Sequence, residues 1–344
     1  MPDKIIKKDQ MKDFIQELCA NYSVYAPIRD EQEVNWSKID NPDQVVFEFT
    51  NTALSPKEFF FPQSECMLSF KNESPSKDPE AMIMKEQPGL IHNQALMNIR
   101  PCDAKAFEIL DKVFCKDEKT TDVYWKDKRD KTAVIGLACS DPCPTCFCSS
   151  VNCGPHNEEG MDVLLKDLGD VYLARPITEK GEKMLGGFEE ADQKTKQQGD
   201  KQKEDAEAKI ESKVLTDNIL SRTTLEEYEH SYWERVFETC INCGTCTFFC
   251  PTCHCFDIQD EVQDEFGRRV RNWDTCMSWL FTHHTSGHNP RGSKKDRVRQ
   301  RFMHKFKYMP YKLQGDIGCV GCGRCTYKCP VNIDVREVVN KMNE

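Results

Sequence analysis

Six cysteines crowd into the sixteen-residue stretch CINCGTCTFFCPTCHC, residues 240–255, and a shorter version, CVGCGRCTYKCP, begins at residue 319. Both stretches fit the pattern C-x2-C-x2-C-x3-C-P. In this pattern the first three cysteines surround a cube of iron and sulfide, and the cysteine before proline ligates the cluster of the other motif. The spacing therefore predicts two [4Fe–4S] clusters with crossed ligation. The predicted ligands are Cys240, Cys243, Cys246 and Cys329 for one cluster, and Cys319, Cys322, Cys325 and Cys250 for the other.

Zinc is the alternative for these motifs, because C-x2-C pairs are common in structural zinc sites. Zinc does not explain a third cysteine at the same spacing, or the proline that follows the fourth cysteine in both motifs. Gly244 and Gly323 leave room for the backbone to approach cluster sulfurs. Clusters whose irons are all ligated by protein pass single electrons. The motifs thus predict a non-catalytic electron-transfer subunit of an oxidoreductase, and no catalytic residue is expected.

The chain has 344 residues, a net charge of −10 and twenty cysteines, and its N-terminus lacks an apolar signal core. Clustered cysteines in such a chain indicate metal ligation rather than disulfides, so we expect a cytoplasmic protein. The negative charge argues against nucleic-acid binding. No apolar stretch approaches the roughly 20 residues of a membrane span. No G-x-G-x-x-G or G-x-x-x-x-G-K-[ST] occurs, so a flavin or nicotinamide would belong to a partner.

Composition divides the chain into three parts and predicts an α+β protein. Residues 1–189 are expected to form a mixed α/β domain, with helices at 7–22 and 103–114 and strands at 43–50, 131–139 and 169–176. Residues 190–213 contain almost nothing to bury, which is typical of a solvated helix or a flexible linker. Residues 214–344, helical at first over 225–239, are expected to form a mainly helical, bacterial-type dicluster ferredoxin-like domain. It is interrupted by about 63 residues between Phe256 and Gly318.

Three further cysteines lie close to the first motif: Cys253, Cys255 and Cys276. They could complete an additional, fourth cluster, with a histidine as the last ligand. The alternative is that they are buried free thiols beside a cluster. The candidate histidines are His254, His283, His284 and His288.

The N-terminal half has its own concentration of cysteines, CSDPCPTCFCSSVNC, at the end of the expected strand 131–139. Loops at the ends of buried strands commonly build sites. Cys102 precedes the expected helix 103–114, and a helix N-terminus favours a thiolate electrostatically. A zinc site or a redox disulfide is one interpretation. We favour a third [4Fe–4S] cluster, because a relay is already present.

Residues 289–312 (NPRGSKKDRVRQRFMHKFKYMPYK) carry nine basic residues against a single acid. Three interpretations remain open for this basic run. It could be a solvated helix, a docking face for an acidic partner, or a source of positive charge that stabilises anionic clusters.

The motifs together resemble the iron–sulfur subunit of anaerobic sulfite reductase and the beta subunit of archaeal sulfhydrogenase. The resemblance covers nearly the whole chain. It rests on YSVYAP, RPCDAKAF, LACSDPCPTCFCSS, CINCGTCTFFCPTCHC, the WDTCM region and CVGCGRCTYKCP. It implies a third-cluster ligand set of Cys102, Cys139, Cys146 and Cys148, with Cys143 and Cys153 outside the pattern.

The resemblance also implies partners. A flavin (FAD) subunit would take electrons from NAD(P)H, and a catalytic subunit of the sulfite reductase or hydrogenase type would receive them. An alternative is the electron-transfer subunit of a heterodisulfide-reductase-like, electron-bifurcating complex, which would share every ligand. A zinc-stabilised interaction protein and an iron–sulfur sensor are further alternatives, although no DNA- or ligand-binding module accompanies the motifs.

Overall fold

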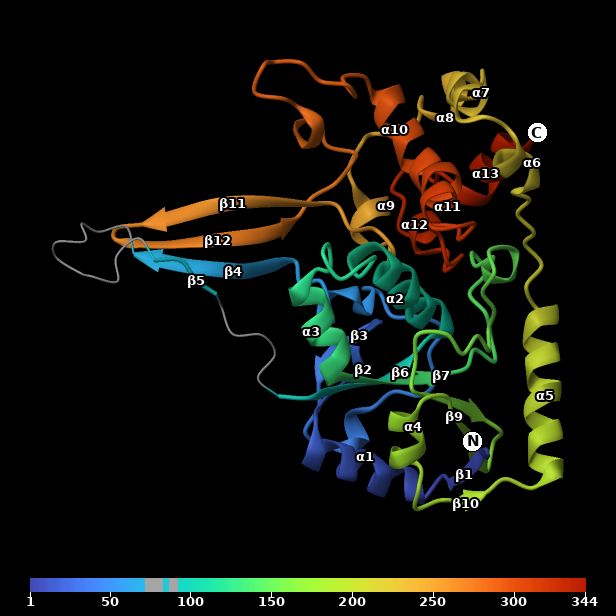
Figure 1. The fold of residues 1–344 in the computed structure, drawn as a ribbon. Helices are drawn as coiled ribbons and strands as arrows, with labels where there is room; N and C mark the ends of the chain where they lie inside the picture. Colours follow the sequence, from blue (N-terminus) through green and yellow to red (C-terminus); the bar gives the residue numbers. More distant parts are fainter. Residues whose placement is uncertain (72–82, 87–91) are drawn as a thin grey trace.

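The computed structural model describes residues 1–71, 83–86 and 92–344. Its larger sheet has the strand order β10-β1-β9-β8-β7-β6-β2-β3 (Figure 1). The central strands β2, β6, β7 and β8 are parallel, and their neighbours outside this group pair antiparallel. The predicted α+β class is confirmed. The strands are β1 (Lys4–Lys7), β2 (Ser23–Asp30), β3 (Glu33–Lys38), β6 (Gln94–Ile99), β7 (Thr132–Leu137), β8 (Val163–Asp167), β9 (Val171–Pro176) and β10 (Glu189–Glu190).

Helices cover both faces of this sheet (Figure 1). On one face lie α1 (Gln10–Asn21) and α4 (Glu179–Met184), and on the other lie α2 (Pro101–Phe114) and α3 (Val123–Lys131). Alternate residues of β7 supply the two cores. Ile135 packs in the same core as Phe14 of α1, whereas Val134 packs in the core of Phe107 and Trp125. Burial on both faces is what a parallel strand flanked by helices requires.

Four of the expected elements are confirmed as α1, α2, β7 and β9. The strand expected at 43–50 is wrong. Asn41 caps a short 3₁₀ turn, η1 (Pro42–Gln44), and its side chain accepts a hydrogen bond from the Asp43 backbone N–H. The chain then runs without regular structure, and Phe47 and Phe49 pack against the core. A hydrophobic run can thus be buried as an irregular segment as well as in a strand.

The charged segment at 190–213 contains a helix, α5 (Gln193–Ala208), which stands beside the sheet domain in Figure 1. Most of α5 is exposed, as its composition predicts. It nevertheless docks at two small residues, because Gly199 lies against Leu173 and Ala206 is only 1% exposed. Just beyond the helix, Ile210 packs against Cys146 and Cys148. The solvated-helix interpretation therefore holds better than the flexible linker.

We expect Ile210→Ala to lower the free energy of unfolding by about 2–5 kcal/mol, the usual cost of removing a buried Ile side chain. Urea denaturation of anaerobically purified protein would measure it. Leu215→Ala is a matched control, because Leu215 is 56% exposed and should change stability by less than about 0.5 kcal/mol. Equal stability of the two variants would contradict docking of this segment.

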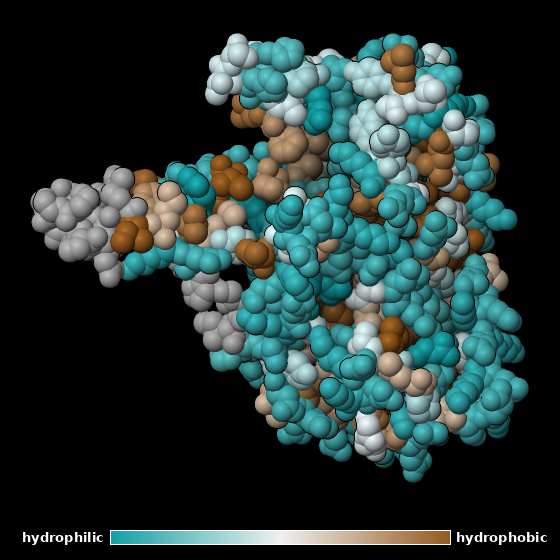
Figure 2. Space-filling view, viewed as in Figure 1, coloured by the Kyte–Doolittle hydropathy of each residue, from teal (hydrophilic) through white to brown (hydrophobic). Residues whose placement is uncertain are grey.

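A second, four-stranded sheet has the order β11-β12-β4-β5 and projects from the body as an arm (Figure 1). Its strands come from both halves of the chain, since β12 pairs antiparallel with β4. The arm bears exposed hydrophobic side chains, including Ile258, Val262 and Phe266, and Figure 2 shows hydrophobic residues along it. Its strands are β4 (Ser64–Lys71), β5 (Lys85–Glu86), β11 (Phe256–Gln263) and β12 (Phe266–Trp273).

The remaining C-terminal part is mainly helical and packs above α2 (Figure 1). Its helices share a core that includes Trp233, Phe302, Phe306 and Val339. None of the helices in the described parts of the chain is long and apolar enough to cross a membrane. The elements are α6 (Asp217–Ser221), α7 (Thr224–Glu229), α8 (Trp233–Val236), α9 (Thr245–Phe248), α10 (Lys294–Met303), the π-helix η5 (His304–Tyr308), α11 (Met309–Lys312), α12 (Arg324–Tyr327) and α13 (Val335–Asn343).

Candidate iron–sulfur centres

The N-terminal cysteines gather where two neighbouring parallel strands end. β6 leads into Cys102 at the start of α2, and β7 leads into Cys139. Because parallel strands present their carboxyl ends at the same edge, the two loops meet there. The loop after β7 folds back on itself, with the Cys139 N–H donating to the Pro155 carbonyl and the Cys146 N–H to that of Cys143. This N-terminal thiol group comprises Cys102, Cys139, Cys143, Cys146, Cys148 and Cys153.

Burial is the main influence on the pKa of Cys102, Cys139 and Cys153 in the N-terminal thiol group. It raises the pKa of Cys139 to about 11 and that of Cys153 to about 12. Burial and the neighbouring Asp103 raise the pKa of Cys102 well above its ordinary value. At Cys102 these two effects outweigh the helix N-terminus, which by itself would lower the pKa of the thiol. Such thiols stay protonated until a metal displaces the proton.

The first motif forms a group with one cysteine of the second. Cys240 lies within electrostatic reach of Cys246, Cys243 and Cys329, whose charges add to the effect of burial and raise its pKa. The same cysteines line one apolar cavity together with Ile241, Met277 and Phe302. Cys243 is the exposed member, whereas the other nineteen cysteines of the chain are buried or half-buried.

The second motif gathers around the last cysteine of the first. Burial raises the pKa of Cys322 to about 12, and Cys250 adds to this increase. Cys250 acts in the same direction on Cys319 and Cys325. The structure thus brings together the residues of both crossed sets. Their ligation of a cluster stays a prediction.

The two motif loops have the same local backbone conformation, as expected if both loops bind the same kind of cluster. The third residue of each motif has a left-handed backbone, with φ of 56° at Asn242 and 65° at Gly321. In both loops the N–H of this residue donates to the sulfur of the first cysteine, Cys240 or Cys319, at 3.4 Å. Backbone donors to thiolate sulfur are a recognised means of tuning cluster potentials.

Close packing joins the second motif to the N-terminal thiol group. The Phe147 N–H donates to the Gly321 carbonyl at 2.8 Å, and a Cβ on Gly321 would lie 2.6 Å from the N and Cα of Cys148. At Gly323 a Cβ would lie 2.3 Å from Thr145 Oγ1. The candidate ligands in these two loops are all cysteine thiols, and Gly321 and Gly323 allow the loops to pack in direct contact. Both features fit iron–sulfur clusters held in adjoining positions.

A buried ion pair crosses the same interface. Arg324 Nη1 lies 2.6 Å from Asp103 Oδ1, and Arg324 Nη2 lies 2.7 Å from Asp103 Oδ2. Asp103 is 1% exposed and Arg324 5% exposed. Arg324 also donates to the Thr52 carbonyl at 3.1 Å. This pair was not predicted from the sequence, although each partner directly follows a cysteine or glycine of a motif.

Three buried cations surround the end of the first motif. Lys57 Nζ donates to the carbonyls of Cys250 and Cys253, both at 3.0 Å, and Arg301 donates to the Cys246 carbonyl at 2.9 Å. Lys305 Nζ donates to the Gly318 carbonyl at 2.8 Å. Burial lowers the pKa of Lys57 to about 8. At Lys305 burial acts in the same direction, but the charges of Cys250 and Cys253 outweigh it and raise the pKa.

The basic run at 289–312 is therefore not a uniformly solvated helix. Its residues Arg301 and Lys305 point into the cysteine region from α10 and η5, and they are 5% and 3% exposed. Positive charge at these positions would stabilise the negative charge of nearby thiolates. Of the three interpretations, stabilisation of anionic centres is the one that these contacts favour. Lys57, which lies far away in the sequence, could not have been found from the motifs.

Cys253, Cys255 and Cys276, which lie near the first motif, form a fourth group. Cys276 lies beside Cys255 and Cys253, and Cys253 lies beside Cys250. Of the histidines considered for this site, His254 is adjacent. The others, His283, His284 and His288, are exposed on the loop before α10. His304, which the motifs did not indicate, lines the same cavity as Cys255 and Cys276.

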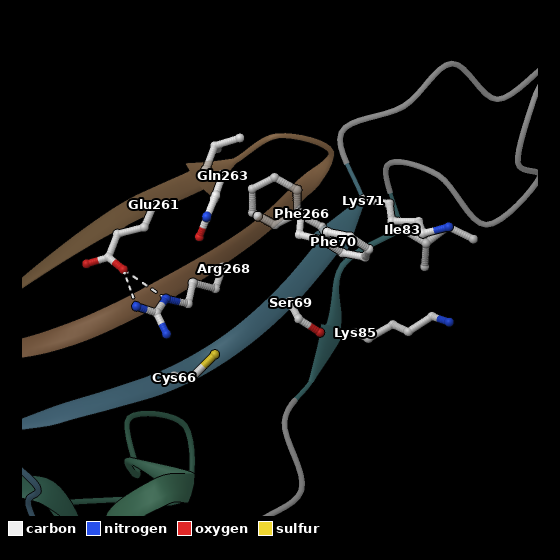
Figure 3. Close-up of a pocket in the computed structure, with 12 residues that line it drawn as sticks. Cys66, Ser69, Phe70, Lys71, Ile83, Lys85, Glu261, Gln263, Phe266 and Arg268 are labelled. Atoms are coloured by element: carbon white, nitrogen blue, oxygen red, sulfur yellow. Dashed lines mark hydrogen bonds and ion pairs between the residues drawn. The ribbon is translucent and has the colours of Figure 1, made fainter.

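The arm holds a cavity of a different kind, of about 750 Å³, lined by residues of β11, β12, β4 and β5. Figure 3 shows Glu261 paired with Arg268 at one side and Phe266 and Phe70 close together at another. Cys66 is the cysteine in its lining. With a single thiol in its lining, this cavity does not resemble the cysteine groups of the body.

All twenty cysteines, which lie in the described part of the chain, are free. Among the described residues, no three His, Cys, Asp or Glu side chains converge closely enough to hold a single metal ion. The two C-x2-C-x2-C-x3-C-P motifs, which this fold brings together, indicate an iron–sulfur protein of the electron-transfer class.

Comparison with known proteins narrows this class. Residues 239–333 match the family described as 4Fe-4S dicluster domain. Over its whole length the chain is similar to sulfhydrogenase 2 subunit beta of Pyrococcus furiosus, with 28% identity over 98% of each chain. No solved structure matches. The resemblance expected from the motifs is thereby confirmed.

Proposed function

We propose that this chain is the electron-transfer iron–sulfur subunit of a cytoplasmic, sulfhydrogenase-like oxidoreductase complex. It would relay electrons between a flavin subunit that oxidises or reduces NAD(P)H and a catalytic subunit of the hydrogenase or sulfite reductase type. The observation that carries the proposal is the continuity of the thiol groups. Cys102 lies beside Cys322, and Cys250 joins the second motif to the first.

In this proposal three [4Fe–4S] clusters lie in series. The N-terminal cluster would use Cys102, Cys139, Cys146 and Cys148, and the crossed pair would use the eight motif cysteines. The clusters supply one-electron transfer when bound. The protein's own residues would bury these clusters. Backbone N–H groups donate to the sulfurs of Cys240 and Cys319, and Arg301 and Lys305 donate to carbonyls beside the predicted ligands. The similarity to a hydrogenase subunit supports a catalytic partner of that kind.

Iron and acid-labile sulfide per chain, with zinc in the same assay, test the proposal on protein purified without oxygen. At least twelve irons per chain are expected, since each [4Fe–4S] cluster holds four. Zinc in place of iron would overturn the relay. Co-purification from the native host tests the partners. A nickel or sirohaem subunit would support the proposal, whereas a flavoprotein of the heterodisulfide-reductase type would favour the bifurcating alternative.

The crossed ligation makes a separate prediction. Cys250→Ala should impair the cluster held mainly by Cys319, Cys322 and Cys325, and leave the cluster of the first motif in place. EPR of the reduced protein distinguishes the two clusters, and Cys115→Ala is the control, because Cys115 lies apart from all four groups. Selective loss of the first motif's cluster would contradict the crossed arrangement.

A further inference from the structure

Six cysteines belong neither to the crossed motifs nor to the N-terminal group. Three of these six lie together beside the β11–β12 hairpin: Cys253, Cys255 and Cys276. The hairpin begins at Phe256, directly after Cys255, and ends at Trp273, and these two residues are paired across the strands. The next residue continues the register, because the Asp274 N–H donates to the Cys255 carbonyl at 3.0 Å. This pairing carries Cys276 back to Cys255 across 21 positions of sequence.

The three residues of this group are neighbours in the structure. Cys255 and Cys276 lie beside each other and form part of the wall of one cavity. Cys253 lies on the inner side, where its backbone N–H donates to the Cys250 carbonyl at 3.3 Å. The trio therefore extends from the crossed motifs outward.

A cavity lies on the outer side of the trio. It measures about 640 Å³, and Cys255 and Cys276 form part of its wall. His254 and His304 flank the two thiols, with ring centroids 5.6 Å apart. Arg291 and Lys312 line the same cavity. The trio therefore adjoins Cys250 of the first motif on its inner side. On its outer side it adjoins a cavity lined by Arg291 and Lys312.

The surroundings are those of an anionic centre rather than of packed thiols. Lys57 donates to the Cys253 carbonyl at 3.0 Å, and Arg301 and Lys305 are buried near Cys253. Burying three cations costs free energy unless negative charge compensates them. Neutral thiols would not supply that charge, whereas metal-bound thiolates and sulfide would.

We propose that Cys253, Cys255 and Cys276 hold a fourth [4Fe–4S] cluster, whose remaining iron faces the cavity beside His304. The inference rests on the proposed relay and extends it, because this cluster would lie next to Cys250 and have one side open. An iron without a protein thiolate is the one that oxidation removes. Ferricyanide, a one-electron oxidant, would convert [4Fe–4S]²⁺ into [3Fe–4S]⁺, Fe²⁺ and one electron, which the ferricyanide accepts.

The test compares full-length, anaerobically purified wild type with Cys276→Ser and Cys255→Ser, and with Cys66→Ser as a matched control on the arm. The wild type and the control should contain about sixteen irons per chain, and each site variant about twelve, since one cluster of four irons is lost. After ferricyanide, wild type should show the EPR signal of an oxidised three-iron cluster, and Cys276→Ser should lack it.

Equal iron in wild type and both site variants would overturn the fourth cluster and return the trio to free thiols. If the variants fail to fold, the wild type decides alone, and absence of the three-iron signal overturns the proposal. A wild type that holds about twelve irons also refutes this inference but leaves the three-cluster relay intact. A wild type that holds zinc and no sulfide refutes the relay itself, so the two failures are distinguishable.

Discussion

Asp103→Asn is expected to lower the free energy of unfolding by about 3–5 kcal/mol, which is the usual cost of breaking a buried ion pair by removing one partner. The substitution keeps the shape of the side chain and removes its charge. Arg324 would then remain 5% exposed with neutral acceptors alone, the Thr52 carbonyl at 3.1 Å among them. A buried guanidinium cannot lose its charge to escape this cost, because its pKa lies too high.

The same substitution should also disturb the N-terminal centre, since Asp103 adjoins Cys102 and the pair fastens the second motif to it. Denaturation under anaerobic conditions and iron content per chain would measure both effects. Asp260→Asn is the matched control. It also breaks a bidentate pair with an arginine, Arg269, but this pair lies on the exposed arm. Equal effects of the two substitutions would show that the buried pair does not join the two parts of the chain.

Gly321→Ala is expected to be nearly as severe, at about 2–5 kcal/mol. A left-handed backbone costs a residue with a Cβ about 1–2 kcal/mol, and overpacking adds about 1–3 kcal/mol. Gly321 has φ of 65°. Its new methyl group would meet the backbone of Cys148, which cannot move aside as a flexible side chain can. The loop of the second motif would have to separate from the N-terminal thiol group.

Gly287→Ala separates the two contributions, because Gly287 has φ of 82° and nothing within 4 Å of a Cβ. It should show the backbone strain without the collision. Urea denaturation would compare the stabilities of Gly321→Ala and Gly287→Ala. The iron content per chain should fall in Gly321→Ala alone. If both variants keep wild-type iron, the close approach of the two loops is not required for the centres.

The local features of this chain were readable from sequence. The motif spacings identified the dicluster domain, because ligation by one loop depends on a few consecutive residues. Periodicity identified α1, α2, β7 and β9. The segment 43–50 failed, because a run of apolar residues does not reveal whether the Asn41 cap and Pro42 will turn the chain out of a strand.

The sequence by itself determined the chemistry of this protein, since the cysteine spacings and flanking prolines are local and name iron and sulfide as the cofactor. Only the tertiary structure showed how residues that are distant in sequence come together. It brought Cys102 to Cys139 through the parallel pairing of β6 and β7, and Cys276 to Cys255 through the register of a hairpin. It also placed Lys57 against the carbonyls of Cys250 and Cys253. These contacts depend on how strands pair and layers pack over long separations, and no short pattern encodes that packing.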